Sequence, residues 1–486
     1  MRHVVYNNMN KDKSGFKREL KLFDAVMIVA GTMIGSGIFI VSADIAREVG
    51  SPGYLLVVWL IGGFITMVGA LSYAELAGMM PKAGGQYVYL REAYNPLVSF
   101  LYGWTLFLVI QTGTIAAVGV AFARFTGVLL PEIISENNTI LDLGFLKISS
   151  LQLLAIASIV LLTYLNSRGV KNGKLIQNVF GSTKLIALFA LIILGFLIGQ
   201  QADAISINFS NMWEPQKVTV LNGVVTGSTP LSGMGIVVAI GIAMIGSLFS
   251  SDSWNNISFA GDEVVDPTKT LVRSLAIGTG LVTLIYILLN VIYLLVLPLP
   301  AIQTATSDRV AVAAASVIGG PAAMLAIAVL IIISTFGCNN GCILSGARVY
   351  YAMAKDGLFF PGMAQINSKG VPAKALWFQC IWACLLCLSG TYGDLLGYVM
   401  FAVIFFYILT IIGIFILRKK MPDLPRPYKA IGYPVLPALY ILLASTFCSI
   451  LLIYRPSNSW PGVFLVLLGI PAYFLFRKQL KPVSSD

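Results

Sequence analysis

The sequence is poor in charged residues. Of its 486 residues only 11% are Asp, Glu, Lys or Arg, whereas an ordinary soluble domain carries roughly 25%. Hydrophobic residues make up 57%, which is enough for about a dozen membrane spans of roughly 20 residues each. So little polar surface excludes a soluble chain, and we expect a polytopic membrane protein.

Histidine is nearly absent and cysteine is confined to apolar segments. The single histidine is His3, so a membrane-embedded metalloprotease or a histidine proton relay has no residues to use. All six cysteines fall within predicted spans, and no external loop carries one. Cys384 and Cys387 form a CxxC pair without a nearby histidine or carboxylate, which favours small packing residues over a metal or redox site. We expect no disulfides, metal or cofactor.

We also expect no cleavable signal peptide. The first 22 residues are polar and rich in lysine, arginine and asparagine, and the first apolar stretch is long enough to stay in the membrane. Apolar runs between polar, glycine or proline breaks predict twelve spans: 23–47, 54–80, 95–127, 150–166, 175–199, 233–260, 271–298, 319–353, 373–389, 394–417, 434–454 and 460–476.

The basic residues give the orientation of these spans. Of 32 lysines and arginines, 25 fall in the termini and in the connections on the same side, six fall on the opposite side, and Lys184 lies inside a span. Positive charge marks the cytoplasmic side, so we expect both termini in the cytoplasm of a multi-pass protein of the plasma (inner) membrane. The net charge of +11 is then orientation, and we expect no nucleic-acid partner because no basic stretch is interleaved with aromatics.

The first span contains three glycines in seven positions, within 31–37. Each interior glycine costs a continuous helix roughly 1 kcal/mol relative to alanine. One interpretation is close helix packing through small residues. The other is an unwound segment at the bilayer midplane, where the N–H groups of Gly35, Ser36 and Gly37 bind an anion such as a carboxylate.

The sixth span contains a polar patch with a carboxylate, Ser250 to Asn256, inside an otherwise apolar segment. Such a patch at membrane depth needs partners or water. It follows the glycine break by five spans, so the two breaks run in opposite directions, as in an inverted repeat of five plus five helices whose breaks meet at one site. The predicted division is a cytoplasmic N-terminal segment at 1–22, a first five-helix repeat at 23–200, an inverted second repeat at 201–420, and helices 11 and 12 with a cytoplasmic tail at 421–486.

At these motifs the chain resembles the amino acid–polyamine–organocation superfamily, and within it the L-type amino acid transporter family, as a prokaryotic-type stand-alone member. Four segments in the family's order carry the resemblance: Gly35 to Phe39; Leu71 to Leu76 with Pro81 to Tyr87; Phe249 to Asn255, similar to the family's FAYDGWN, with Glu263 to Pro267; and Asn340 to Arg348 with Ala354 to Gly357. The resemblance implies an all-α polytopic LeuT-type fold with broken helices 1 and 6, and alternating access around an amino acid site.

The sequence departs from the family pattern in two places. Ser251 and Ser253 replace an aromatic residue and a glycine of FAYDGWN, so the side-chain specificity differs from the pattern. The predicted external loop at 128–149 has no cysteine, whereas members with a heavy chain use a disulfide there. We therefore expect no disulfide-linked heavy chain, and only the amino acid and the lipid bilayer as partners.

An amino acid can bind to such breaks largely through backbone groups. We expect its carboxylate on the amides of Gly35, Ser36 and Gly37, where the following half-helix adds its positive end. Its ammonium is expected on the carbonyls released where the helices unwind. The predicted substrate-binding set is Thr32, Met33, Ile34, Gly35, Ser36, Gly37, Phe249, Ser250, Ser251 and Asp252, with Phe249 also as an aromatic gate and Trp254 packing the half-helix.

Lys184 is the most informative single charge. The apolar run after it, 185–198, has 14 residues and is too short to span, so the helix must take Lys184 into the membrane. One interpretation is snorkelling to the inner face over about 13 Å. The family resemblance favours another: the ammonium occupies the position of a cation in sodium-coupled relatives, between the first break and the eighth helix near Ser334 and Thr335. Transport is then independent of sodium.

Two carboxylates have predicted structural roles. Glu75, near the inner end of the second span, is interpreted as snorkelled or paired with a loop. Asp252 either pairs with a cationic substrate or holds the unwound backbone, and the structural role is preferred because the family pattern also carries Asp there.

The predicted function is sodium-independent exchange of neutral L-amino acids, small polar or apolar, by alternating access. Proton-coupled symport and transport of cationic amino acids or polyamines stay open as alternatives. A membrane-embedded enzyme is disfavoured because no paired-Asp motif or nucleophile elbow is present. A receptor would need a soluble output domain, for which the tail of about ten residues leaves no room, and two antiparallel broken helices form one occluded site rather than the ring of filter loops that a channel uses.

Overall fold

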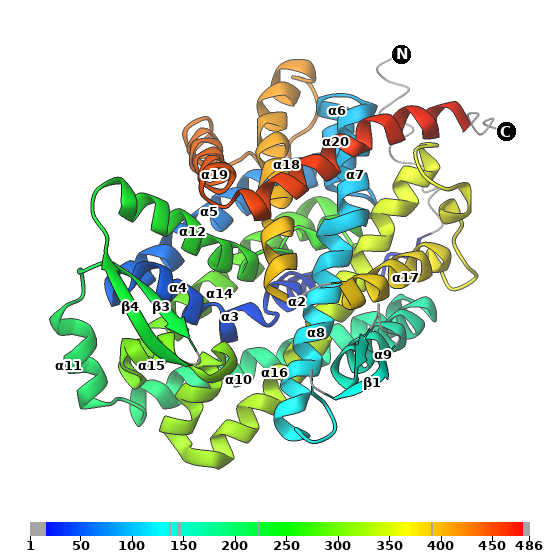
Figure 1. The fold of residues 1–486 in the computed structure, drawn as a ribbon. Helices are drawn as coiled ribbons and strands as arrows, with labels where there is room; N and C mark the ends of the chain where they lie inside the picture. Colours follow the sequence, from blue (N-terminus) through cyan, green and yellow to red (C-terminus); the bar gives the residue numbers. More distant parts are fainter. Residues whose placement is uncertain (1–15, 136–137, 143–146, 222, 390–391, 480–486) are drawn as a thin grey trace.

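The computed structural model describes residues 16–135, 138–142, 147–221, 223–389 and 392–479. Residues 1–15 of the predicted N-terminal segment, with His3, and residues 480–486 of the predicted tail lie outside this set. The described chain is a bundle of helices with two small hairpins at its margin (Figure 1).

The first half of the chain begins with a helix that is interrupted twice and continues through four long helices. Its elements are α2 (Leu22–Met33), α3 (Gly37–Ile40), α4 (Ser42–Val49), α5 (Pro52–Met79), α6 (Gln86–Ala93), α7 (Pro96–Thr105), the π-helical turn η1 (Leu106–Ile110), α8 (Gln111–Leu129), β1 (Thr139–Asp142), β2 (Lys147–Ser149), α9 (Ser150–Ser167), α10 (Val170–Leu197), α11 (Ala202–Ser210), β3 (Gln216–Leu221) and β4 (Val224–Pro230).

The second half begins with another interrupted helix. Its elements are α12 (Met234–Ser250), α13 (Asn256–Phe259), η2 (Gly261–Glu263), α14 (Pro267–Val296), α15 (Leu299–Gln303), η3 (Thr306–Asp308), α16 (Val310–Lys355), η4 (Pro361–Ala364), α17 (Ala373–Ser389), α18 (Tyr392–Lys420), α19 (Val435–Tyr454) and α20 (Pro456–Gln479).

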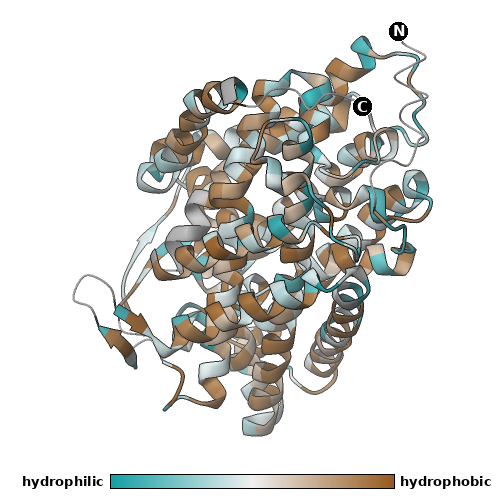
Figure 2. Ribbon diagram, turned by 90° about the vertical axis from the view of Figure 1, so that its right-hand side faces the viewer, coloured by the Kyte–Doolittle hydropathy of each residue, from teal (hydrophilic) through white to brown (hydrophobic). Residues whose placement is uncertain are grey.

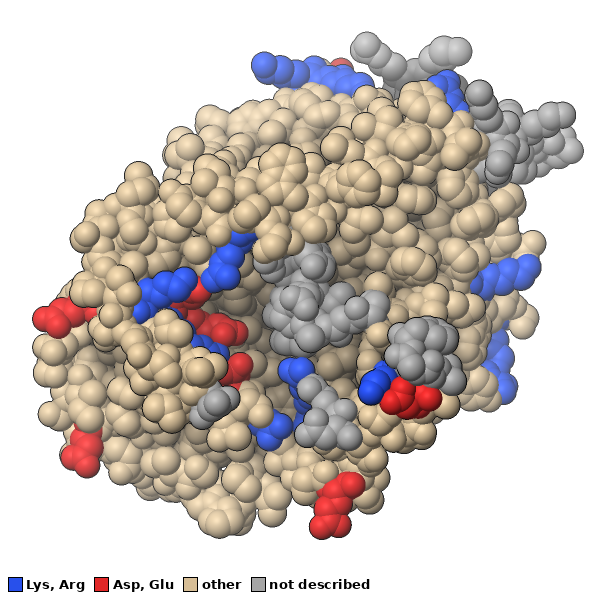
Figure 3. Space-filling view, in the orientation of Figure 1, with Lys and Arg blue, Asp and Glu red and all other residues tan. Residues whose placement is uncertain are grey.

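The described residues include nine helices that are long and apolar enough to cross a membrane, and three shorter apolar helices, Leu22–Met33, Met234–Ser250 and Ala373–Leu388. Hydrophobic residues dominate the helices in Figure 2. Charged side chains occupy only a small part of the face shown in Figure 3. The protein is therefore an all-α polytopic membrane protein, as predicted. The count of twelve spans, the five-plus-five repeat and the division at residues 200 and 420 stay predictions.

Three local features were not predicted. Antiparallel hairpins, β1 with β2 and β3 with β4, lie in connections between predicted spans. The third predicted span contains the π-helical turn η1. The eighth predicted span, 319–353, begins inside α16, at a kink where Gly319 and Gly320 leave helical geometry before Pro321; proline cannot continue the hydrogen-bond ladder of the preceding turn, so the segment before the kink forms a separate arm.

Ion pairs with buried carboxylates join the helices at the end that the charge pattern predicts to be cytoplasmic. Glu75 of α5 accepts hydrogen bonds from Arg418 Nε and Nη2, in the last turn of α18, at 2.9 and 2.7 Å. It also accepts one from the Ala430 amide in the loop after α18 at 2.7 Å, so the predicted pairing with a loop is present beside an ion pair with the helix end. Glu263 and Arg348 form a second pair, Oε1 to Nε 2.7 Å, with side chains 0% and 1% exposed. Breaking a buried pair on one side costs about 3–5 kcal/mol.

Candidate functional site

The helices break at the two places that the sequence indicates. The first break separates α2 from α3 at Ile34, Gly35 and Ser36, and the second separates α12 from α13 between Ser251 and Asn255. The two breaks touch: a Cβ placed on Gly37 would lie 2.2 Å from Ser250 Oγ, so only glycine fits there. The predicted meeting of the breaks is therefore present.

The carbonyls of the first break all have protein partners. Thr32 O accepts a hydrogen bond from Cys338 Sγ at 3.0 Å, and Met33 O accepts one from Tyr286 OH at 3.0 Å. Gly35 N donates to Met33 O at 2.9 Å, so its amide is committed within the break. Met33 O thus has two donors already, and so has Ile34 O, which accepts from Lys184 Nζ and Ser334 Oγ. Thr32 O, which accepts from Cys338 Sγ, has a second lone pair for a bound ammonium.

Lys184 of α10 is buried against this break. Its Nζ donates to Gly31 O at 2.7 Å, to Ile34 O at 2.8 Å and to Ser334 O at 3.3 Å, and the residue is 1% exposed. Three carbonyl oxygens around one cation resemble the oxygen ligands that hard cations prefer. The side chain does not snorkel, because its ammonium points into the protein and not to the inner face.

The two predicted companions of Lys184 on α16 behave differently. Ser334 contributes both its carbonyl and its hydroxyl, whose Oγ lies 3.1 Å from Ile34 O. Thr335 Oγ1 donates to its own helix, at Ile331 O, 2.8 Å away. The structure therefore brings Ser334 to the break, while the Thr335 hydroxyl serves the helix.

The second break has its own supports. Ser250 O accepts a hydrogen bond from Tyr286 OH at 2.9 Å, and Ser253 O lies 3.0 Å from Thr32 Oγ1. Tyr286 thus touches both breaks, because the same hydroxyl lies 3.0 Å from Met33 O. Ser253 has φ +68°, a left-handed conformation that favours glycine, which explains why the family pattern has glycine at this position.

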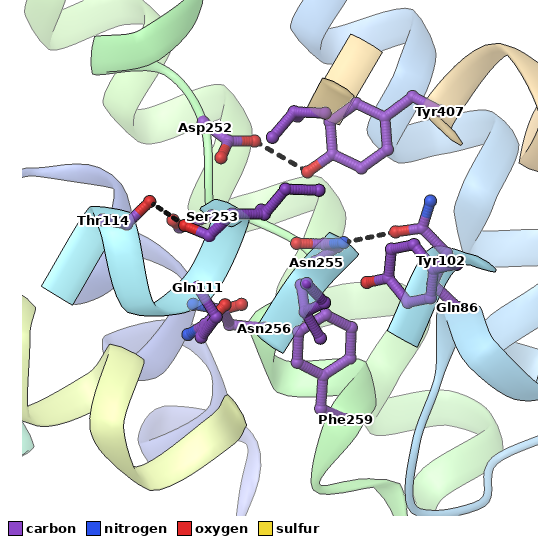
Figure 4. Close-up of a pocket in the computed structure, with 13 residues that line it drawn as sticks. Gln86, Tyr102, Gln111, Thr114, Asp252, Ser253, Asn255, Asn256, Phe259 and Tyr407 are labelled. Atoms are coloured by element: carbon purple, nitrogen blue, oxygen red, sulfur yellow. Dashed lines mark hydrogen bonds between the residues drawn. The ribbon is translucent and has the colours of Figure 1, made fainter. Parts of the chain in front are cut away.

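A narrow pocket opens on the second break (Figure 4). Asp252 lies in its wall and accepts a hydrogen bond from Tyr407 OH of α18 at 2.7 Å. Most of the wall can form hydrogen bonds. The lining residues are Gln86, Tyr102, Leu106, Ile110, Gln111, Thr114, Asp252, Ser253, Asn255, Asn256, Phe259, Val403 and Tyr407.

The aromatic residues of the second break pack into the core. Trp254 lies against Tyr73 and Tyr407, with ring centroids 5.1 and 5.0 Å away, so it packs the half-helix as expected. Phe249 is 8% exposed at the end of α12, between the polar patch and the apolar core. Its role as a gate stays a prediction.

Sequence reasoning missed several residues of this region. Tyr286 and Tyr407 lie in long apolar helices that each contain more than one tyrosine, and nothing local distinguishes them from the others. Gln86 and Asn255 fall inside motifs that carried the family resemblance, and a signal for them existed there. Of the ten predicted substrate-binding residues, Asp252 alone lines this pocket; the others lie outside its wall.

Comparison with known proteins agrees with this architecture. The profile of the family described as "Amino acid permease" matches residues 20–473. The chain belongs to the amino acid permease family. The permease is 32% identical over 464 residues to the human "Large neutral amino acids transporter small subunit 2", covering 94% of this chain and 80% of that protein. It is 30% identical over 477 residues to the mouse "b(0,+)-type amino acid transporter 1", covering 95% and 88%.

These relatives confirm the family resemblance drawn from the motifs. The permease is accordingly a multi-pass membrane transporter whose substrate is an amino acid, and it is not an enzyme.

Proposed function

We propose that the permease exchanges neutral L-amino acids across the membrane without sodium, by alternating access. The observation that carries the proposal is the Lys184 ammonium, held by Gly31 O, Ile34 O and Ser334 O between the first break and α16. A fixed positive charge in this position binds the carbonyl oxygens that a bound cation would otherwise bind. The site therefore needs no external cation.

The break geometry supports binding of the amino acid backbone. The substrate carboxylate is assigned to the Ser36 and Gly37 amides, next to Gly35. Here the chain enters α3, which α4 follows, so the positive end of a helix points at the carboxylate. The ammonium is assigned to the carbonyls of Thr32, Met33 and Ile34 and to the end of α12 at Phe249, Ser250 and Ser251. Phe249 is assigned as the gate over this site.

The pocket at the second break supports a small neutral side chain. It is narrow, and its wall is mostly amides and hydroxyls, with aliphatic contact from Leu106, Ile110 and Val403. Asp252 carries the only formal charge in the wall of this pocket, and Tyr407 already occupies one of its oxygens. This favours alanine, serine and threonine over large apolar side chains.

One observation favours a second candidate. Asp252 still offers a carboxylate to the pocket, so a cationic amino acid could pair with it directly. The name of the b(0,+)-type relative does not decide between the two. Competition of alanine and lysine against one labelled neutral substrate separates them.

Topology and assembly follow from the same proposal. We infer cytoplasmic termini in a plasma (inner) membrane from the 25-to-6 division of basic residues. The relatives named as small subunits contrast with the absence of cysteine from 128–149, which supports function without a disulfide-linked heavy chain.

The test is uptake into proteoliposomes. Uptake should be equal in sodium and choline buffers, and preloading with unlabelled amino acid should accelerate it strongly. A strict, saturable sodium requirement contradicts the role of Lys184. Little acceleration by preloading, together with acceleration by an inward proton gradient, would establish the proton-coupled alternative.

A further inference from the structure

Gln86 lies outside the predicted site, at the first residue of α6 on a cytoplasmic connection, but its side chain lines the pocket at the second break (Figure 4). The residue is 1% exposed. A long amide on a loop between two membrane helices is more often solvated, so its burial needs a cause.

The loop before Gln86 is pressed against the end of the second broken helix. Gly84 N donates to Phe259 O at 3.0 Å. A Cβ placed on Gly85, whose φ is +44°, would lie 2.4 Å from Ser258 Oγ. Two glycines therefore let the backbone lie directly on α13, and this contact carries the Gln86 side chain into the protein.

Inside the protein, Gln86 joins three elements by a directed chain of hydrogen bonds. Thr410 of α18 donates its hydroxyl proton to Phe406 O at 2.7 Å, so its oxygen must act as an acceptor towards Gln86. Gln86 Nε2 donates to Thr410 Oγ1 at 2.9 Å, and its Oε1 therefore faces Asn255. Asn255 Nδ2 donates to that Oε1 at 2.9 Å.

This chain fixes the orientation of Asn255 from outside the break. Asn255 is the last residue before α13 and lines the pocket with Asp252 and Ser253. The unwound segment lacks the regular backbone hydrogen bonds of a helix. The hydrogen bond to Gln86 Oε1 therefore holds the Asn255 side chain in its orientation. The donor-to-acceptor direction of these hydrogen bonds is set at Phe406 O, which lies in the regular helix α18.

We propose that Gln86 is a positioning residue of the transport site, which holds the Asn255 carboxamide at the pocket wall and so sets the affinity for the substrate side chain. The inference rests on the proposed function. Gln86 acts on the substrate through Asn255, and Thr410 acts through Gln86.

The experiment measures KM and maximal exchange rate in proteoliposomes for Gln86→Met, which keeps the length of the side chain and removes both hydrogen bonds. The expected result is a KM raised about tenfold, the size of one or two lost hydrogen bonds, with the maximal rate within about twofold. Thr410→Val should raise KM about threefold, and Thr410→Ser, which keeps the hydroxyl, should restore it.

A double-mutant cycle tests the route of the effect. In an Asn255→Ala background, Gln86→Met should raise KM less than twofold further, because its target is gone. Gln152→Met serves as the matched control, since this amide donates to Cys387 O at 3.2 Å, away from the pocket, and its KM should stay unchanged.

Two results would overturn the inference. One is an unchanged KM in Gln86→Met with only the yield or thermal stability reduced, which is a purely structural role. The other is a full tenfold rise of KM in the Asn255→Ala background. Neither touches the proposed function, which instead fails if the wild-type protein exchanges no amino acid.

Discussion

The two helix breaks expose backbone in the membrane and satisfy it by different means. At the first, between α2 and α3, a single buried ammonium, Lys184 Nζ, holds two carbonyls within 2.8 Å and a third at 3.3 Å. At the second, between α12 and α13, neutral hydroxyls hold the backbone carbonyls, Tyr286 at Ser250 O and Thr32 at Ser253 O. Tyr407 and Gln86 hold side chains of this break, those of Asp252 and Asn255.

This difference has energetic consequences. A charge-assisted hydrogen bond contributes about 1.5–3 kcal/mol and a neutral one about 1 kcal/mol. The first break has neutral partners in Cys338, Tyr286 and Ser334. Its charge-assisted hydrogen bonds all come from Lys184, whose loss removes three hydrogen bonds at once. At the second break the loss of any one partner removes only one or two hydrogen bonds. Two of its side chains, Ser251 and Ser253, differ from the family pattern.

The largest effect is expected from Lys184→Met. The substitution removes three charge-assisted hydrogen bonds, each of about 1.5–3 kcal/mol, and leaves Ile34 O with the Ser334 hydroxyl. Exchange in a counterflow assay should fall roughly thirtyfold or more per folded transporter. Lys171→Met on the same helix, where the side chain is exposed, is the control and should leave exchange intact. Unchanged exchange in Lys184→Met would remove the distinction between the two breaks.

A smaller effect is expected where the breaks share a partner. Tyr286→Phe removes the hydroxyl that lies 3.0 Å from Met33 O and 2.9 Å from Ser250 O. Loss of one hydroxyl that serves two buried carbonyls should cost about 1–2 kcal/mol, or roughly tenfold in KM. Tyr293→Phe on the same helix is the comparison, because Tyr293 OH reaches Ile38 O alone, at 3.3 Å. Equal effects of the two variants would show that bridging the breaks adds nothing.

The third variant tests the neutral character of the second break. Tyr407→Phe removes the hydroxyl that donates to Asp252 Oδ1 at 2.7 Å, which frees that oxygen for a substrate cation. Inhibition of neutral uptake by lysine should strengthen about fivefold relative to inhibition by alanine, the range of one charge-assisted hydrogen bond. Adding Asp252→Asn should cancel the gain. A gain that persists without the carboxylate would assign it to pocket size instead.

The sequence predicted the breaks more readily than their partners. Glycine residues and a polar patch stand out in apolar helices, and Lys184 stood out because 185–198 is too short to span. Tyr286 and Tyr407 have no such contrast, since the face that a tyrosine presents depends on which helices pack around it. The hairpin β3–β4 did have a local signal, alternating valine and threonine around an Asn-Gly pair at 222–223. Long apolar runs, which indicate membrane spans, do not reveal such a hairpin.

Ser253 shows how a departure from the family pattern can be read once the backbone is known, and it carries the smallest expected effect. Its φ is +68°, whereas Ser251 in the same break has φ −96°. Alanine and glycine at both positions separate the backbone from the lost hydroxyl. At 253 glycine should be more stable than alanine by about 1 kcal/mol, because a Cβ is disfavoured in the left-handed region. At 251 alanine should be more stable by about 0.5–1 kcal/mol, because glycine loses more conformational entropy on folding. Thermal unfolding of the purified protein measures both differences. The same sign at the two positions would mean that Ser253 is held by its contacts and not strained, and the glycine of the family pattern would then need another cause.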